Sequence, residues 1–183
     1  MKYSPTDIPG VWLIELERRA DDRGYFARTW CEQEFRKHGL NSAVTQINTA
    51  VSTRAGTLRG MHYQESPDAE VKVVRCVRGA LFDVTVDLRA DSPTRGRWFG
   101  TTLSGVNGLA LYIPEGCAHG YITLEPDTEL MYMASVPYAP KSARGVRFDD
   151  PAFGIRWPRA AEVISEQDRT WPEFKGQISM GDN

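Results

Sequence analysis

The sequence predicts an all-β fold of the jelly-roll or small-barrel type with a few short helices. Apolar and polar residues alternate with a period of two over most of the chain, which is typical of β-strands. Single Gly, Pro, Asn and Asp residues separate these runs at short intervals, as they do in sandwiches and barrels. No repeat, low-complexity tract or linker interrupts the pattern, so we expect residues 1–183 to form one domain.

Helical periodicity is present in only two places. The first is residues 31–38, where Trp30 and Phe35 could face inward, and the second follows Ser165. The strands that we expect, in chain order, are residues 57–64, 71–77, 81–88, 109–113, 120–124 and 130–135. Arg78-Gly79 is expected to join the second strand to the third as a hairpin turn, because glycine tolerates a positive φ.

Several of these strands carry a polar or ionisable group on the same face as apolar residues. In a small barrel such a face points into a closed interior, where an unpartnered charge is costly, so a ligand site would explain the groups. A solvated outer face of a sandwich would explain them equally well. The groups, each with its neighbours on the face, are His62 with Leu58, Gly60 and Gln64; Lys72 with Val74 and Cys76; Asp83 with Thr85; and Tyr132 with Leu130 and Ala134.

The composition excludes several classes of protein. With 22 Lys and Arg against 24 Asp and Glu, the net charge of −2 is not that of a general nucleic-acid binder. No apolar run approaches the roughly 18 residues of a membrane span, and the first ten residues do not form a secretion signal, so we expect a cytoplasmic protein without a membrane partner. The three cysteines form no CxxC pair, so neither a disulfide framework nor a thiolate zinc site is indicated.

The segment from Pro114 to Gly120 resembles the second motif of the cupin superfamily, in which Pro-x-Gly-x-x-His places a histidine in the barrel. It contains Cys117-Ala118-His119. Metal-binding cupins also have a His-x-His motif, but the matching place here is His62-Tyr63-Gln64. His62, His119 and Asp83 could form a facial triad for a metal, yet the ligand spacing favours acid–base or binding roles and no metal or other cofactor.

Most of the chain, from Arg23 to Trp157, resembles the dTDP-4-dehydrorhamnose 3,5-epimerase family, a metal-free branch of the cupins that acts on nucleotide-linked 4-keto-6-deoxy sugars. The resemblance implies loss of a proton from a carbon beside a ketone and its return from the opposite face. The matching segments are residues 22–26 (DRGYF), 58–64 (LRGMHYQ), 72–75 (KVVR), 82–87 (FDVTVD), 92–94 (SPT), 114–120, 131–132 (MY), 138–140 (YAP), and Asp150-Pro151 through Trp157-Pro158.

The resemblance assigns four catalytic roles. His62 is the general base, because an imidazole with an ordinary pKa of about 6.5 is largely neutral near pH 7. Asp168 would orient His62, although Ser165-x-x-Asp168 is also a helix-capping pattern. Tyr132 is the acid on the opposite face of the sugar, and Lys72 stabilises the enolate oxygen. Asp83 and His119 would support Lys72 or hold a sugar hydroxyl.

The resemblance also implies the substrate and the assembly. Arginine side chains suit a diphosphate, and Arg23 and Phe26 would come from a neighbouring subunit, which implies a homodimer with exchanged N-terminal strands. Arg28 stands where the family usually has a glutamate that accepts a hydrogen bond from thymine, and Met133, Pro137 and Gln167 are further departures. The residues expected to bind the nucleotide-diphospho-sugar are Arg23, Phe26, Arg28, Gln46, Asn48, Arg59 and Tyr138, with Asp83 and His119 beside the sugar.

We therefore expect a cofactor-independent isomerase of deoxysugar biosynthesis that inverts C3, C5 or both. Three alternatives remain open: a mono-epimerase of a CDP- or GDP-linked sugar, which the Arg28 change would suit, a metal-dependent cupin isomerase or oxygenase, and a sugar-nucleotide-binding module without activity.

Overall fold

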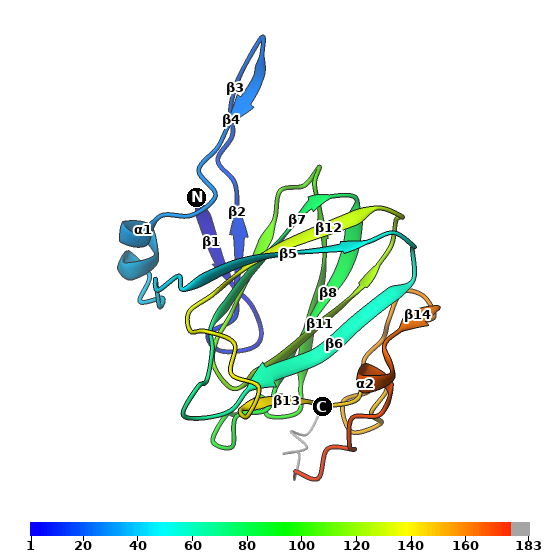
Figure 1. Ribbon diagram of the computed structural model, residues 1–183. Coiled ribbons are helices and arrows are strands. Elements are labelled where there is room, and N and C mark those ends of the chain that lie inside the picture. Colours follow the sequence, from blue (N-terminus) through cyan, green and yellow to red (C-terminus); the bar gives the residue numbers. More distant parts are fainter. Residues whose placement is uncertain (177–183) are drawn as a thin grey trace.

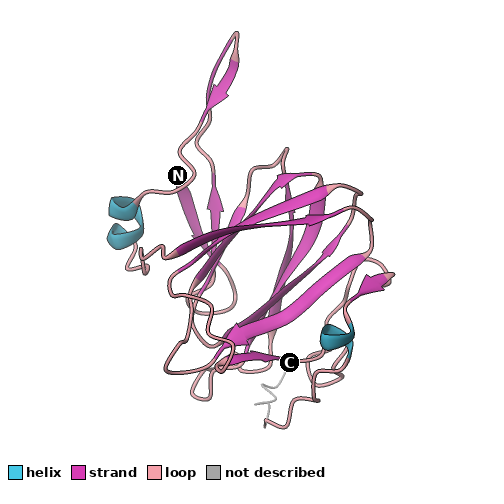
Figure 2. Ribbon diagram, viewed as in Figure 1, coloured by secondary structure: helices cyan, strands magenta, loops and turns pink. Residues whose placement is uncertain are grey.

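Two antiparallel β-sheets face each other and enclose the interior of the molecule (Figures 1 and 2). The computed structural model describes residues 1–176. One sheet has the strand order β1 (Lys2–Pro5), β2 (Trp12–Glu15), β10 (Ala110–Ile113), β7 (Lys72–Arg78), β12 (Thr128–Ala134) and β5 (Gln46–Ser52). The other has the order β13 (Ala143–Gly145), β6 (Thr57–Gln64), β11 (Cys117–Thr123), β8 (Ala80–Asp87) and β9 (Trp98–Ser104), with β14 (Val163–Ile164) parallel to β6.

The two remaining strands and the two helices lie outside this sandwich. The strands β3 (Arg19–Asp21) and β4 (Gly24–Phe26) form a separate hairpin, and Figure 1 shows it projecting away from the sheets. The helices are α1 (Glu32–Lys37) and the single turn α2 (Glu166–Arg169). Within residues 1–176, neither helix is long and apolar enough to cross a membrane.

The expected all-β fold with a few short helices is confirmed, and each of the six expected strands is present within a few residues of its expected bounds. Both helices are also where the periodicity places them, and Phe35 of α1 is fully buried.

The expected hairpin between the strands around Arg78-Gly79 is wrong. Gly79 has a positive φ of 72°, as expected, but β7 and β8 belong to different sheets. β7 is paired on one side with β10 and on the other with β12, and β8 is paired with β11 and β9. The chain therefore crosses from one sheet to the other at Gly79, and a Cβ there would lie 2.5 Å from Thr128 Oγ1.

Both faces of β8 are buried. Asp83, Thr85 and Asp87 are fully buried, so the solvated outer face that was one interpretation of the polar pattern is excluded for β8. Val84 and Val86 are buried as well, in a cluster completed by aromatic residues of the C-terminal segment, namely Phe148, Phe153, Trp157 and Phe174. A second cluster, which includes Val74, Leu111 and Leu130, fills part of the space between the sheets.

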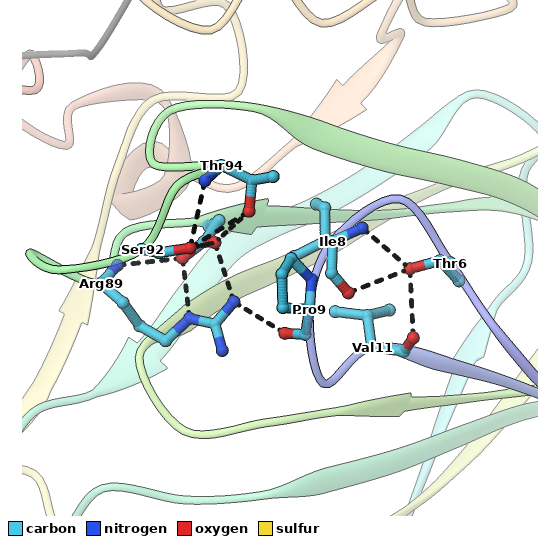
Figure 3. A network of polar contacts seen from close by, with 8 residues as sticks. Thr6, Ile8, Pro9, Val11, Arg89, Ser92 and Thr94 are labelled. Carbon is cyan, nitrogen blue, oxygen red and sulfur yellow. Dashed lines mark hydrogen bonds and ion pairs between the residues drawn. The ribbon is translucent and has the colours of Figure 1, made fainter. Parts of the chain in front are cut away.

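A polar network ties the loop after β8 to the N-terminal segment (Figure 3). The carboxylate of Asp87 accepts hydrogen bonds from the hydroxyls of Ser92 (2.5 Å) and Thr94 (2.7 Å) and from the guanidinium of Arg89 (2.9 and 2.8 Å). Arg89 also donates to the carbonyl of Pro9 at 2.8 Å. Burial alone would raise the pKa of Asp87, but these hydrogen bonds outweigh burial and lower it.

Candidate active site

A cavity of about 580 Å³ lies between the sheets and collects the polar side chains of the interior. An adjoining hollow of about 400 Å³ shares His62, Lys72, Tyr132 and Gln167 with it, so the two form one continuous site. His62 comes from β6, Lys72 from β7 and Tyr132 from β12, so groups from both sheets converge here. Three of the four strand faces identified from the sequence, those of His62, Lys72 and Tyr132, therefore meet at one cavity.

His62 forms a hydrogen-bonded pair with Asp168 of α2. The His62 Nε2 to Asp168 Oδ1 distance is 2.5 Å, and the backbone N–H of Gly60 donates to Asp168 Oδ2 at 3.2 Å. Burial raises the pKa of Asp168, but the hydrogen bond and charge of His62, with the Gly60 bond, lower it overall, so the carboxyl is ionised near neutral pH. A carboxylate only accepts hydrogen bonds, so Nε2 carries the proton and Nδ1 is the free basic nitrogen.

Ser165 places Asp168 where His62 can reach it. Its hydroxyl caps α2 by accepting a hydrogen bond from the Asp168 backbone N–H at 3.1 Å, and β14 pairs the preceding residues with β6. The capping interpretation and the His62 pairing are therefore both correct. The Trp171 ring lies edge-on to His62, with 6.2 Å between ring centroids, and limits the space on that side.

Tyr132 reaches the cavity from the opposite sheet. Burial, and then the negative charge of Glu70, raise the pKa of its phenol above the ordinary value for tyrosine. The hydroxyl is therefore protonated at neutral pH and can donate a proton.

Lys72 forms an ion pair with Glu70 that the sequence analysis did not anticipate. The Lys72 Nζ to Glu70 Oε1 distance is 2.8 Å, and each side chain is 12% exposed. Glu70 precedes β7 in the chain, two positions before Lys72, so the period-two rule would have put Glu70 on the same face as Lys72 if the expected strand had been extended.

His119 and Asp83 form a second pair, deeper in the sandwich. His119 Nε2 lies 2.9 Å from Asp83 Oδ2, and Asp83 is fully buried. Burial raises the pKa of Asp83, and the charges of His119 and Lys72 only partly offset this effect. His62 and His119 are paired across β6 and β11, but each Nε2 faces its own carboxylate. In residues 1–176 no three His, Cys, Asp or Glu side chains are placed to hold a metal ion, so the triad with Asp83 does not form.

Besides His119, four of the expected substrate-binding residues line this site. Arg59 lines the larger cavity, where its guanidinium also contacts the backbone carbonyl of Val51 at 3.3 Å. Gln46, Asn48 and Tyr138 line the adjoining hollow, and Gln46 Oε1 accepts a hydrogen bond from the Tyr138 backbone N–H at 2.9 Å.

Three expected contacts lie outside this cavity in the single chain. Arg23 is 89% exposed on the β3–β4 hairpin and pairs with Asp21. Phe26 is 71% exposed, and Arg28 binds Glu34 of α1 at 2.9 Å.

Trp171, Tyr121 and Gln167 also line the site, although they were not among the site residues expected from the sequence. Tyr121 lies two positions after His119 on β11, so face counting could have found it. Trp171 lies beyond the last strand, where strand periodicity carries no information.

Comparison with known proteins gives one consistent result. A family model described as dTDP-4-dehydrorhamnose 3,5-epimerase matches residues 5–176. A dTDP-4-dehydrorhamnose 3,5-epimerase of Sinorhizobium fredii is 44% identical over 95% of this chain and 90% of its own length. A dTDP-4-dehydrorhamnose 3-epimerase of Streptomyces niveus is 41% identical over 92% of this chain and 82% of its own. The crystal structure of the Bacillus anthracis 3,5-epimerase with TDP and PPi bound superimposes with a TM-score of 0.91, at 36% identity over 94% of this chain and 99% of that one.

Proposed function

The chain belongs to the dTDP-4-dehydrorhamnose 3,5-epimerase family, and we propose that His62, Lys72, Tyr132 and Asp168 are the residues through which it acts. It is an isomerase of deoxysugar biosynthesis that epimerises a dTDP-linked 4-keto-6-deoxy sugar. The observation that carries the residue assignment is the convergence of these four side chains on one cavity between the sheets.

The proposed reaction uses catalytic groups from both sheets. The free Nδ1 of His62 takes the proton from the carbon beside the C4 ketone, and the electron pair of that C–H bond moves to form an enolate. The Lys72 ammonium stabilises the negative charge on the enolate oxygen, and Asp168 stabilises the imidazolium. Tyr132 returns a proton to the opposite face of the same carbon, which inverts it. His62 then loses its proton and Tyr132 regains one by exchange with solvent.

The test follows deuterium from D₂O into dTDP-4-keto-6-deoxyglucose by proton NMR. We expect His62→Ala to abolish incorporation, because no base remains. Tyr132→Phe should still incorporate deuterium but without inversion, since the base can return the label to the same face. The control is Tyr3→Phe, which removes a buried hydroxyl outside the cavity. Incorporation by His62→Ala at the wild-type rate would refute the assignment.

The same spectra count the carbons that react. Relatives at similar identity carry the names of a 3,5-epimerase and of a 3-epimerase. We propose inversion at both carbons, so label is expected at C3 and at C5. Label at C3 alone would identify a mono-epimerase, and faster exchange of a CDP- or GDP-linked substrate would contradict the choice of thymidine.

We further propose a homodimer in which the β3–β4 hairpin of one chain completes the nucleotide site of the other. The hairpin carries Arg23 and Phe26 away from its own sheets (Figure 1), and both side chains are largely exposed. Ile47 and Val51 of the edge strand β5 are also exposed, at 60% and 44%, and offer an apolar surface for a second copy.

Mixed dimers test this assembly. Arg23→Ala and His62→Ala chains should each have little activity alone, and refolding them together should restore activity, because one site of each mixed dimer has neither defect. No recovery, or a monomer by light scattering, would refute the exchange.

A further inference from the structure

Glu70 is a charged group of the site that the proposed function leaves without a role. Its carboxylate lies 2.8 Å from Lys72 Nζ, and it lines the hollow that also contains His62 and Tyr132. With both side chains only 12% exposed, water screens this pair far less than it screens an ion pair on the surface.

The ion pair restricts the position of the flexible Lys72 side chain. A lysine ammonium sits on a flexible four-carbon stem with three rotatable N–H donors, so by itself it does not hold one position. Glu70 accepts one of these donors, which fixes the position of Nζ and leaves the other two for a substrate oxygen. Stabilisation of a developing negative charge depends on such a donor being in place before the reaction.

We propose that Glu70 is a positioning residue of the epimerase: it fixes the Lys72 ammonium in the cavity and keeps a negative charge near the Tyr132 hydroxyl. The inference rests on the proposed function, because it assigns Glu70 its role through Lys72 and Tyr132.

The negative charge of Glu70 near the Tyr132 hydroxyl predicts a pH dependence of the reaction. The titratable and charged groups that share the site with Tyr132 are Lys72 and Glu70 at β7, His62 and Arg59 of β6, His119 and Tyr121 of β11, Arg144 of β13 and Asp168 of α2, with Asp83 of β8 behind His119. Among them, Glu70 is the group whose charge raises the pKa of Tyr132, after burial. Removal of that charge should therefore move the alkaline limb of the kcat profile to lower pH.

Two variants distinguish the effect of Glu70 on the position of Lys72 from the effect of its negative charge on Tyr132. Glu70→Ala removes both the acceptor and the charge, so kcat should fall about ten- to a hundredfold with a change in KM below about threefold. Glu70→Gln keeps an oxygen that can accept from Lys72, so it should recover most of kcat near pH 7 while the alkaline limb remains shifted. Deuterium incorporation and kcat would be measured from pH 6 to 10.

The matched control is Glu129→Ala. Glu129 lies on β12 outside the cavity, and its carboxylate is 3.7 Å from the guanidinium of Arg78. This variant should leave kcat and its pH profile unchanged. Wild-type kcat and pH profile in both Glu70 variants would overturn the proposal, as would a change confined to KM. If Glu70→Ala does not fold, the pH profile of Glu70→Gln decides alone. Failure of the wild-type chain to exchange any sugar nucleotide would instead refute the proposed function.

Discussion

The substitution Asp168→Asn tests the tautomer of His62 most directly. Asp168 offers two oxygens to three donors: Oδ1 accepts from His62 Nε2 at 2.5 Å and from the Trp171 indole N–H at 3.4 Å, and Oδ2 accepts from the Gly60 backbone N–H at 3.2 Å. Asparagine has only one side-chain oxygen. The N–H groups of Gly60 and Trp171 can only donate, and the Gly60 bond is the shorter of the two, so we expect the asparagine oxygen to face Gly60 and its NH₂ group to face His62. Nε2 must then accept a hydrogen bond, and the proton moves to Nδ1, the nitrogen that should act as the base.

The size of the effect follows from the exposure of the ring. In Ser-His-Asp triads the corresponding change costs about 10⁴ in kcat. The His62 side chain is 42% exposed, so water can compensate for part of the loss, and we expect a fall of about 10² to 10⁴ in kcat. Asp168→Ala presents no donor to Nε2 and leaves either tautomer accessible, so it should lose less activity than Asp168→Asn.

The assay is the deuterium exchange of dTDP-4-keto-6-deoxyglucose, with binding of dTDP measured by calorimetry as the control for folding. Binding should be unchanged in both variants because Asp168 acts on His62. An asparagine variant within about tenfold of the wild-type kcat, or one more active than the alanine variant, would refute the reasoning.

Asp87→Asn should lower the free energy of unfolding by about 3 kcal/mol, measured in urea, because it weakens the hydrogen bonds around the fully buried Asp87 carboxylate. The lowered pKa of Asp87 stabilises the fold above the ordinary aspartate range, and this contribution is lost as the pH falls through the lowered value, so stability should drop less steeply on acidification in the variant than in the wild type. Equal slopes would contradict this. Gly60→Ala should prevent folding or lower the melting temperature by more than about 10 °C, since φ is +135° and the new Cβ would lie 2.5 Å from Gly120 Cα. Gly39→Ala, at φ +70° with nothing within 4 Å, is the control and should cost only about 1 kcal/mol.

The alternation of residue types predicted strand faces well and strand partners poorly. Along β6, β7 and β12 it grouped His62, Lys72 and Tyr132 with apolar residues on one face but left open whether that face is buried, and in the structure all three line the cavity. It could not show that β7 and β8 belong to opposite sheets, because alternation identifies the buried face of a strand and not its neighbour. It also gave no signal for β5, where the apolar Ile47 and Val51 are exposed and the polar Gln46 and Asn48 face the site.

The site was predictable where one strand carries one group, and less so where the chain leaves the sheets. The role of Asp168 was found by resemblance alone, because the pattern that marks a helix after Ser165 does not show which strand that helix contacts. Glu70 was missed because it lies just before the residues that form β7. Arg23, Phe26 and Arg28 lie on or just after the β3–β4 hairpin, which projects away from both sheets. Alternation of residue types does not predict where such a hairpin lies.

The attachment of α2 has a consequence for how activity is lost. Asp168 reaches His62 on a single turn that is held by one serine cap and by a two-residue pairing of β14 with β6. So small a unit opens at a lower free energy than the eleven-stranded framework beside it. Turnover should therefore disappear at a urea concentration at which the sheets are still folded. A protease that cuts this segment should abolish activity without unfolding the sheets.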